Sequence, residues 1–111
     1  MERMRQRADF LAAASGLKVH AGAFVLQARR RDDEGPARVG FTVSKKVGNA
    51  VERNRVRRRL REVARQVIPD QARADLDYVL VGRQAALKRD FALLRQELVE
   101  ALKRLKALAT P

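Results

Sequence analysis

Apolar residues recur every three or four positions in three parts of the chain, the spacing that places them on one face of a helix. In residues 5–15 these positions are Phe10, Ala13 and Ala14. Asp9 falls in the first turn or caps it, and Gly16 is expected to stop the helix because glycine tolerates a left-handed cap. The pattern predicts a short helix near the amino terminus.

The longest amphipathic stretch is predicted to begin just after Gly48. Asn49 and Glu52 have the spacing of a capping box, in which each side chain accepts a hydrogen bond from the other residue's backbone N–H. A projection at about 100° per residue gathers five apolar residues on one face: Val56, Leu60, Val63, Ala64 and Val67. Pro69 is expected to end this helix.

A third helix is predicted near the carboxyl terminus, with Asp90 as its cap. Its apolar stripe consists of Phe91, Leu94, Leu98, Leu102, Leu105 and Leu108. Steps of three and four residues of this kind are typical of a surface helix that packs on a core.

Period-two alternation predicts strands before the central helix. In residues 18–30 the two faces would hold Phe24, Leu26 and Ala28 on one side and Val25, Gln27 and Arg29 on the other. A bend at Gly22 would instead make the first half a separate short strand. Residues 38–44 form a second predicted strand, and residues 31–37 a polar loop, so we expect an antiparallel hairpin.

Leu76–Gly82 is the most strand-like run, and its apolar continuity suits a central strand that is buried on both faces. The order helix–strands–helix–strand–helix predicts an α+β fold, a two-layer sandwich with helices packed on a small sheet. No internal repeat or low-complexity segment interrupts it, so we expect one domain over residues 1–111.

Composition adds a strong bias toward positive charge. The 111 residues carry a net charge of +12, and 34% of them are charged. A phosphate-rich partner is the leading explanation; an anionic membrane is the other, although no run approaches the roughly 18 apolar residues of a spanning helix. The basic start resembles a signal peptide, but Asp9 interrupts it, so we expect a cytoplasmic protein.

Chemistry within the chain looks sparse. The absence of cysteine excludes disulfides, thiolate zinc sites and a thiol nucleophile. His20 stands alone and is interpreted as structural. Asp32, Asp33 and Glu34 could hold a cation, but consecutive carboxylates on a turn more often only solvate it. With no nucleophile–base pair, no predicted metal site and no phosphate-cradling glycine loop, the residues indicate a binding protein.

The positive charge concentrates in residues 44–65, which hold nine Lys or Arg residues against Glu52 and Glu62. The helical projection places these polar residues opposite the apolar face: Asn54, Arg57, Arg58, Arg61 and Arg65. Arg55 and Arg59 lie on one flank, and Arg53 lies near the apolar edge. Arginine suits bidentate phosphate contact and stacking on bases, so we predict nucleic-acid binding. RNA is favoured over DNA because the helix belongs to a mixed sheet domain.

This block resembles the signature of the bacterial ribonuclease P protein family. The resemblance rests on Arg53-Asn54-Arg55, preceded by Ser44-Lys45-Lys46-Val47-Gly48-Asn49-Ala50-Val51 and followed by Arg57, Arg58 and Arg61. Residues 38–43, the Asp9–Phe10 pair and the Phe24-Val25-Leu26 run also resemble that family, in the same order along the chain. The resemblance implies an α–β–β–β–α–β–α order with a left-handed crossover between parallel strands.

Family membership would also imply a function. The protein would bind the catalytic ribonuclease P RNA and precursor tRNA, without a further protein partner or a membrane, and the RNA with its Mg²⁺ would hydrolyse the 5′ leader from the tRNA. The residues expected to bind RNA are Lys45, Lys46, Arg53, Asn54, Arg55, Arg57, Arg58, Arg61 and Arg65. A cleft for the single-stranded leader is expected to be lined by Phe10, Phe24, Thr42 and Ser44.

Two positions depart from the family pattern, which often has aromatics where this chain has Ala14 and Gln27. The stacking surface is therefore thinner, and leader contact would depend more on charge and hydrogen bonds. Phe10 has an alternative interpretation as core filling between helix and sheet. Two other functions also stay open: a ribosomal-type RNA-binding protein without an enzymatic role, and a DNA-binding module.

Overall fold

The computed structural model describes residues 2–31, 35–71 and 75–109. Within these ranges the strands are β1 (Glu2–Arg3), β2 (Leu17–His20), β3 (Phe24–Arg30), β4 (Arg38–Val43) and β5 (Leu76–Gly82). The α-helices are α1 (Arg7–Ala14), α2 (Ala50–Gln71) and α3 (Phe91–Ala109), and the 3₁₀ turns are η1 (Lys45–Val47) and η2 (Gln84–Leu87). The predicted element order is confirmed, with the two-residue β1 as an addition.

One mixed sheet has the strand order β1-β4-β5-β3-β2. β5 lies at its centre, parallel to β4 and antiparallel to β3, which confirms the prediction of a central buried strand. The predicted hairpin between residues 18–30 and 38–44 is wrong, because β5 lies between β3 and β4. The hairpin that forms is β2–β3, so residues 18–30 hold two strands, as the bend at Gly22 would require.

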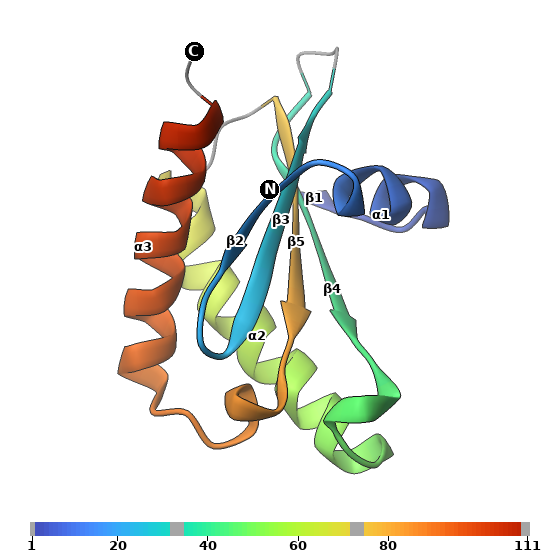
Figure 1. Ribbon diagram of the computed structural model, residues 1–111, viewed down its shortest axis with the longest axis vertical. Helices are drawn as coiled ribbons and strands as arrows, with labels where there is room; N and C mark the ends of the chain where they lie inside the picture. Colours follow the sequence, from blue (N-terminus) through green and yellow to red (C-terminus); the bar gives the residue numbers. More distant parts are fainter. Residues whose placement is uncertain (1, 32–34, 72–74, 110–111) are drawn as a thin grey trace.

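The connection from β4 through α2 to β5 joins two adjacent parallel strands. With the strands running downward in Figure 1, β4 lies to the right of β5 and α2 passes behind them. The crossover is therefore left-handed, as the family resemblance implied and against the strong general preference for right-handed connections.

Helices α2 and α3 cover one face of the sheet, and α1 lies at the other side (Figure 1). The main core lies between the sheet and the two long helices. All five predicted apolar positions of α2, from Val56 to Val67, are buried there. A smaller cluster of Met4, Ala13 and Val79, with Phe10 and Val81 packed against it, lies under α1.

The ends of the helices differ from the predictions in three places. α1 begins two residues later than expected, because the preceding backbone pairs with β4: the Met4 N–H donates to the Val39 carbonyl over 2.9 Å. Gly16 does not adopt a left-handed conformation; a Cβ there would lie 2.1 Å from the Ala28 carbonyl oxygen, so glycine allows close packing on β3. α2 continues past Pro69 to Gln71, and the buried side chains of Val67 and Ile68 anchor that last turn.

The carboxyl-terminal helix follows its predicted pattern except at its end. The Asp90 carboxylate accepts a hydrogen bond from the Ala92 N–H over 2.8 Å, which confirms the cap. Leu94, Leu98, Leu102 and Leu105 are buried, but Leu108 is 59% exposed because the last turn adds little to the core. Across the described ranges, no helix has the length and apolar character needed to cross a membrane.

Candidate nucleic-acid interface

The start of α2 is fixed by reciprocal hydrogen bonds. The Glu52 N–H donates to the Asn49 side-chain oxygen over 2.9 Å, and the Asn49 N–H donates to the Glu52 carboxylate over 3.0 Å. The predicted capping box is confirmed. A Cβ at Gly48 would lie 2.5 Å from that Glu52 carboxylate oxygen, so glycine leaves room for the cap. Because the cap fixes the first turn of α2, it also fixes the directions in which the following arginine side chains point.

The polar face of α2 is open, opposite its buried face. A shallow hollow of about 480 Å³ is lined by Val51, Asn54, Arg57, Arg58 and Arg61. The Asn54 side-chain oxygen accepts a hydrogen bond from Arg57 over 3.1 Å. Four of the predicted RNA-binding residues therefore surround one concave surface, and we call these five residues the arginine face.

The other predicted RNA-binding residues lie around this face. Arg65, one turn beyond Arg61, is exposed, and its Nε donates to the Glu62 carboxylate over 3.1 Å. Hydrogen bonds from Arg65 and then Gln66 hold the pKa of Glu62 below its usual range. Lys45 and Lys46 are exposed on η1. The guanidinium of Arg65 is therefore exposed but already paired with the Glu62 carboxylate.

The flank of α2 that faces η2 holds Arg55 and Arg59. Arg55 is exposed, whereas Arg59 donates to the backbone carbonyl of Arg89 and ties α2 to the start of α3. Arg53 is half-buried, as its predicted place near the apolar edge requires. The two arginines of the Arg53-Asn54-Arg55 motif therefore flank the arginine face, and Asn54 lies within it.

The sheet face away from α2 and α3 is only partly covered. Strand registers align Thr42, Val81, Val25 and His20 in one row across β4, β5, β3 and β2. Thr42 and His20 are exposed, and Val25 and Val81 are half-buried. We call this row the open strip. Thr42 was predicted from the sequence; the other three were missed, although their alternation with buried neighbours marks them as one face.

Phe10 lies at the border between α1 and the open strip. Its ring packs on β4 so closely that a Cβ at Gly40 would lie 2.5 Å from the ring atom Cε1. Val79 and Val81 belong to the same small cluster. Because Phe10 is half-buried, it fills the space between helix and sheet and still leaves part of its surface accessible.

The prediction that Phe24 lines a leader cleft is wrong. Phe24 is fully buried in the main core, on the face that α2 and α3 cover, and so lies on the opposite side of the sheet from Phe10. Alternation showed that Phe24 and Val25 point to opposite faces, but not which face the long helices cover. Ser44, the last predicted cleft residue, is exposed after β4, and its Oγ accepts a hydrogen bond from the Lys46 N–H over 3.3 Å.

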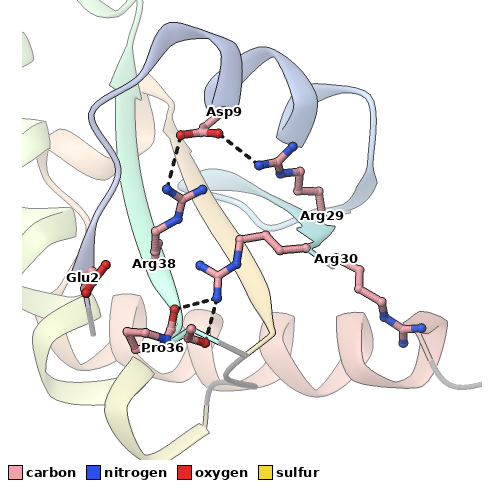
Figure 2. A pocket seen from close by; sticks show the side chains of 8 residues that line it. Glu2, Asp9, Arg29, Arg30, Pro36 and Arg38 are labelled. Carbon is pink, nitrogen blue, oxygen red and sulfur yellow. Dashed lines mark hydrogen bonds and ion pairs between the residues drawn. The ribbon is translucent and has the colours of Figure 1, made fainter. Parts of the chain in front are cut away.

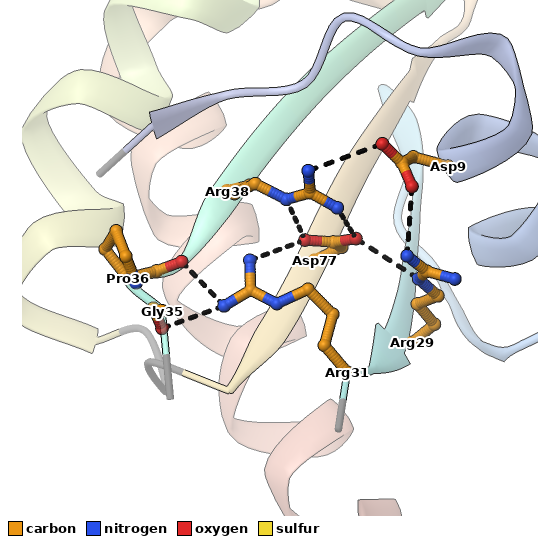
Figure 3. Close-up of polar contacts among 7 residues, drawn as sticks. All are labelled: Asp9, Arg29, Arg31, Gly35, Pro36, Arg38 and Asp77. Carbon is orange, nitrogen blue, oxygen red and sulfur yellow. Dashed lines mark hydrogen bonds and ion pairs between the residues drawn. The ribbon is translucent and has the colours of Figure 1, made fainter. Parts of the chain in front are cut away.

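Sequence reasoning also missed a cluster of charges at one end of this sheet face (Figure 3). Asp77 of β5 is fully buried. Its carboxylate accepts hydrogen bonds from Arg38 at 2.7 Å through both Nε and Nη2, from Arg31 at 3.0 Å and from Arg29 at 3.2 Å. A carboxylate inside the apolar run 76–82 was the available signal, because a buried acid requires a cationic partner.

The charge state of this cluster follows from its contacts. Burial by itself would raise the pKa of Asp77, but hydrogen bonds from Arg38 and Arg29 and the attraction of Arg38 and Arg31 outweigh it, so the pKa lies below its usual value. The same pairing with Asp77 raises the pKa of Arg38 despite its desolvation. Asp77 is therefore ionised at neutral pH.

Acidic and metal-ligating side chains do not gather elsewhere on the parts of the chain that the structure describes: no group of three or more His, Asp or Glu residues there could hold a metal ion. The acidic residues Asp32, Asp33 and Glu34 lie outside the described ranges. His20 is exposed on the open strip, and its backbone carbonyl accepts a hydrogen bond from Arg104 over 3.4 Å.

These features define a class: a small, basic α+β protein with a left-handed crossover, in which one long helix carries a dense group of arginines on its polar face. The family model described as Ribonuclease P matches residues 1–106 of the chain. The ribonuclease P protein component of Erythrobacter litoralis is 50% identical over 101 residues, covering 91% of this chain and 83% of that protein. That of Paramagnetospirillum magneticum is 51% identical over 113 residues, covering 97% and 85%.

Solved structures agree with the sequence comparisons. The ribonuclease P protein of Staphylococcus aureus superposes with a TM-score of 0.77 at 29% identity, over 96% of each chain. That of Thermotoga maritima gives a TM-score of 0.77 at 30% identity, over 94% of this chain and 97% of the other. The chain belongs to the ribonuclease P protein family. It is a protein component of ribonuclease P, an enzyme of tRNA processing, and an RNA partner is implied by that membership.

Proposed function

We propose that this chain binds the ribonuclease P RNA and the 5′ leader of precursor tRNA, so that the RNA-based endonuclease removes the leader and forms the mature 5′ end. The observation that carries the proposal is the arginine face, which is exposed on the side of α2 opposite its packed side, in a chain of the ribonuclease P protein family.

The arginine face suits an RNA backbone for physical reasons. Arg57, Arg58 and Arg61 surround one hollow, and their forked guanidinium groups match the geometry of phosphate oxygens. The net charge of +12 adds a long-range attraction that steers a polyanion toward the protein. We assign the ribonuclease P RNA to this face, with Arg53, Arg55 and Arg65 at its margins.

The open strip suits a single strand. Phe10 offers part of an aromatic ring beside Val81 and Val25, and a ring face stacks on any base without strong sequence preference. Thr42 and Ser44 add hydroxyl groups, and Lys45 and Lys46 add positive charge where β4 ends. We assign the precursor tRNA leader to this surface, where Ala14 and Gln27 supply no further ring.

In this proposal the protein binds and positions, and the RNA performs the hydrolysis with Mg²⁺ that the RNA holds. The family resemblance of the chain supports this division of roles. The hydrolase activity is then a property of the ribonucleoprotein in the cytoplasm, and the side chains of this protein contact RNA without forming or breaking bonds.

Reconstitution tests the proposal directly. The chain is combined with a bacterial ribonuclease P RNA and precursor tRNA at low magnesium, where leader cleavage by the RNA alone is slow. We expect cleavage to be stimulated strongly. If the chain binds the RNA but does not stimulate cleavage, it is a structural RNA-binding protein; if duplex DNA outcompetes structured RNA at fixed salt, it is a DNA-binding module.

A further inference from the structure

Ion pairs hold α1 on the sheet. The helix has only eight residues, and Ala13 is the one that it buries fully. An isolated helix of this length is not stable in water. One carboxylate oxygen of Asp9 lies 3.0 Å from Arg29 on β3, and the other lies 3.3 Å from Arg38 on β4. A single side chain thus ties α1 to two strands (Figure 3).

Both of these arginines are held in turn by Asp77. Arg29 and Arg38 each contact Asp9 at one end of the guanidinium and the fully buried Asp77 at the other. A planar guanidinium that is bound at both ends has little freedom to rotate. The contacts form a continuous path from the central strand through Arg29 and Arg38 to Asp9.

The path ends next to Phe10. Arg38 and Gly40 are two positions apart on β4 and so lie on the same face of that strand. This face therefore binds Asp9 through Arg38 and contacts the Phe10 ring at Gly40. We propose that Asp9 is a positioning residue: through Arg29 and Arg38, which Asp77 anchors, it fixes the Phe10 ring at the border of the open strip and so sets the affinity for the leader. This inference rests on the proposed function of that strip.

The cluster itself does not suit an anionic ligand. A hollow of about 550 Å³ lies over it, lined by Arg29, Arg30, Arg31 and Arg38 together with Glu2, Asp9 and the backbone near Pro36 (Figure 2). The carboxylates of Asp9, Asp75 and Asp77 form ion pairs with these four guanidinium groups. Each of the four arginines is therefore already paired with a carboxylate of the protein, which favours a structural linkage over a phosphate site.

The test compares holoenzymes reconstituted with ribonuclease P RNA and one of several protein variants. Asp9→Asn keeps the shape of the side chain but removes its charge. Glu2→Gln is the matched control, because Glu2 lines the same hollow from β1. We expect Asp9→Asn to weaken binding of precursor tRNA by about three- to tenfold and to leave mature tRNA, which has no leader, unchanged. Asp9→Glu, which retains the carboxylate, should recover part of the loss.

A double-mutant cycle separates positioning from general destabilisation. If Asp9 acts through Phe10, Asp9→Asn combined with Phe10→Ala should lose no more leader affinity than Phe10→Ala alone. Hydrogen exchange should show faster opening of α1 in Asp9→Asn but not in Glu2→Gln.

Two results would overturn the inference while leaving the proposed function intact. The first is that the losses of leader affinity caused by Asp9→Asn and Phe10→Ala are additive in the double variant. The second is that Asp9→Asn weakens binding of precursor and mature tRNA equally, although Phe10→Ala weakens only the precursor. If Phe10→Ala itself does not discriminate, the proposed leader surface is wrong and the inference falls with it. Thermal unfolding of each variant shows that the proteins compared are folded.

Discussion

At the scale of single residues, Phe10 shows why packing and binding need not be alternatives. Its ring fits against Gly40, where any larger residue would collide with it, yet the side chain is only half-buried. A ring held in this way has already lost its rotational freedom, so stacking a base on it costs little further entropy. The same packing means that truncation at this position needs a careful control.

We therefore predict that Phe10→Ala weakens precursor tRNA binding by about 1–3 kcal/mol, the usual range for loss of one stacked base, and leaves mature tRNA unaffected. Phe10→Leu retains apolar packing on Gly40 without a ring face, and should show most of the same loss. Binding titrations with both RNAs measure the effect. Equal weakening of both RNAs by both variants would indicate that Phe10 only fills the core.

Asp77 gives the second prediction at this scale. Replacing it with Asn leaves Arg29, Arg31 and Arg38 around a neutral side chain, and breaking a buried ion pair in this way costs about 3–5 kcal/mol. Denaturant unfolding at neutral pH measures the loss. A conservative change at the exposed Glu2 is the control and should have little effect.

The stability difference between the native chain and Asp77→Asn should depend on pH, because the pKa of Asp77 is lowered in the folded native chain. In the unfolded chain the Asp77 carboxyl titrates near pH 4. The stabilisation that this carboxylate gives is therefore complete above about pH 4 and is lost as the pH falls through its lower pKa in the folded state. The gap in unfolding free energy between the native chain and Asp77→Asn should therefore narrow below about pH 4. A gap that stays constant in acid would show that the ionised carboxylate is not its source.

At the scale of elements, local patterns predicted the helices well and the strand pairing poorly. The capping box and apolar stripe of α2 depend on residues three and four positions apart, which the sequence displays directly. The partner of β4 depends on a strand more than thirty residues away. The short loop before β4 suggested a hairpin, but a strand as apolar as β5 is stable only with neighbours on both edges, so it separates β3 from β4.

The candidate site was predictable to the same extent. The arginine face follows from α2 alone, and its residues lie where the helical projection placed them. The open strip combines one residue from each of four strands, so it required the registers. The error at Phe24 and the omission of Asp77 have one origin: alternation separates two faces of a strand but does not identify what covers each of them.

For α2 we predict an effect on the salt dependence of RNA binding. Arg57→Ala together with Arg61→Ala should weaken binding to ribonuclease P RNA and reduce the slope of log K against log salt by close to one unit for each phosphate that the variant no longer neutralises. Arg95→Ala with Lys103→Ala on α3 removes the same charge elsewhere and is the control. An unchanged slope in the α2 variant would place these two arginines away from phosphate.

At the scale of the whole molecule, topology and charge have different relations to the sequence. The left-handed crossover could not be expected from the residues, because general chain geometry favours the opposite hand; only the family resemblance implied it. The charge, in contrast, can be counted directly. A net charge of +12 on 111 residues, with nine Lys or Arg residues within positions 44–65, means that the folded state gathers charges that the unfolded chain spreads apart.

A binding surface built in this way should reduce the stability of the free protein. We predict that Arg57→Ala with Arg61→Ala raises the thermal midpoint by roughly a few degrees at about 10 mM salt, although the same variant binds RNA less well. At about 1 M salt, where screening acts within a few ångströms, the difference should nearly vanish. Arg95→Ala with Lys103→Ala, outside the dense cluster, should stabilise less. If the α2 variant is less stable at low salt, local contacts such as that between Arg57 and Asn54 outweigh repulsion, and the arginine face imposes no cost on folding.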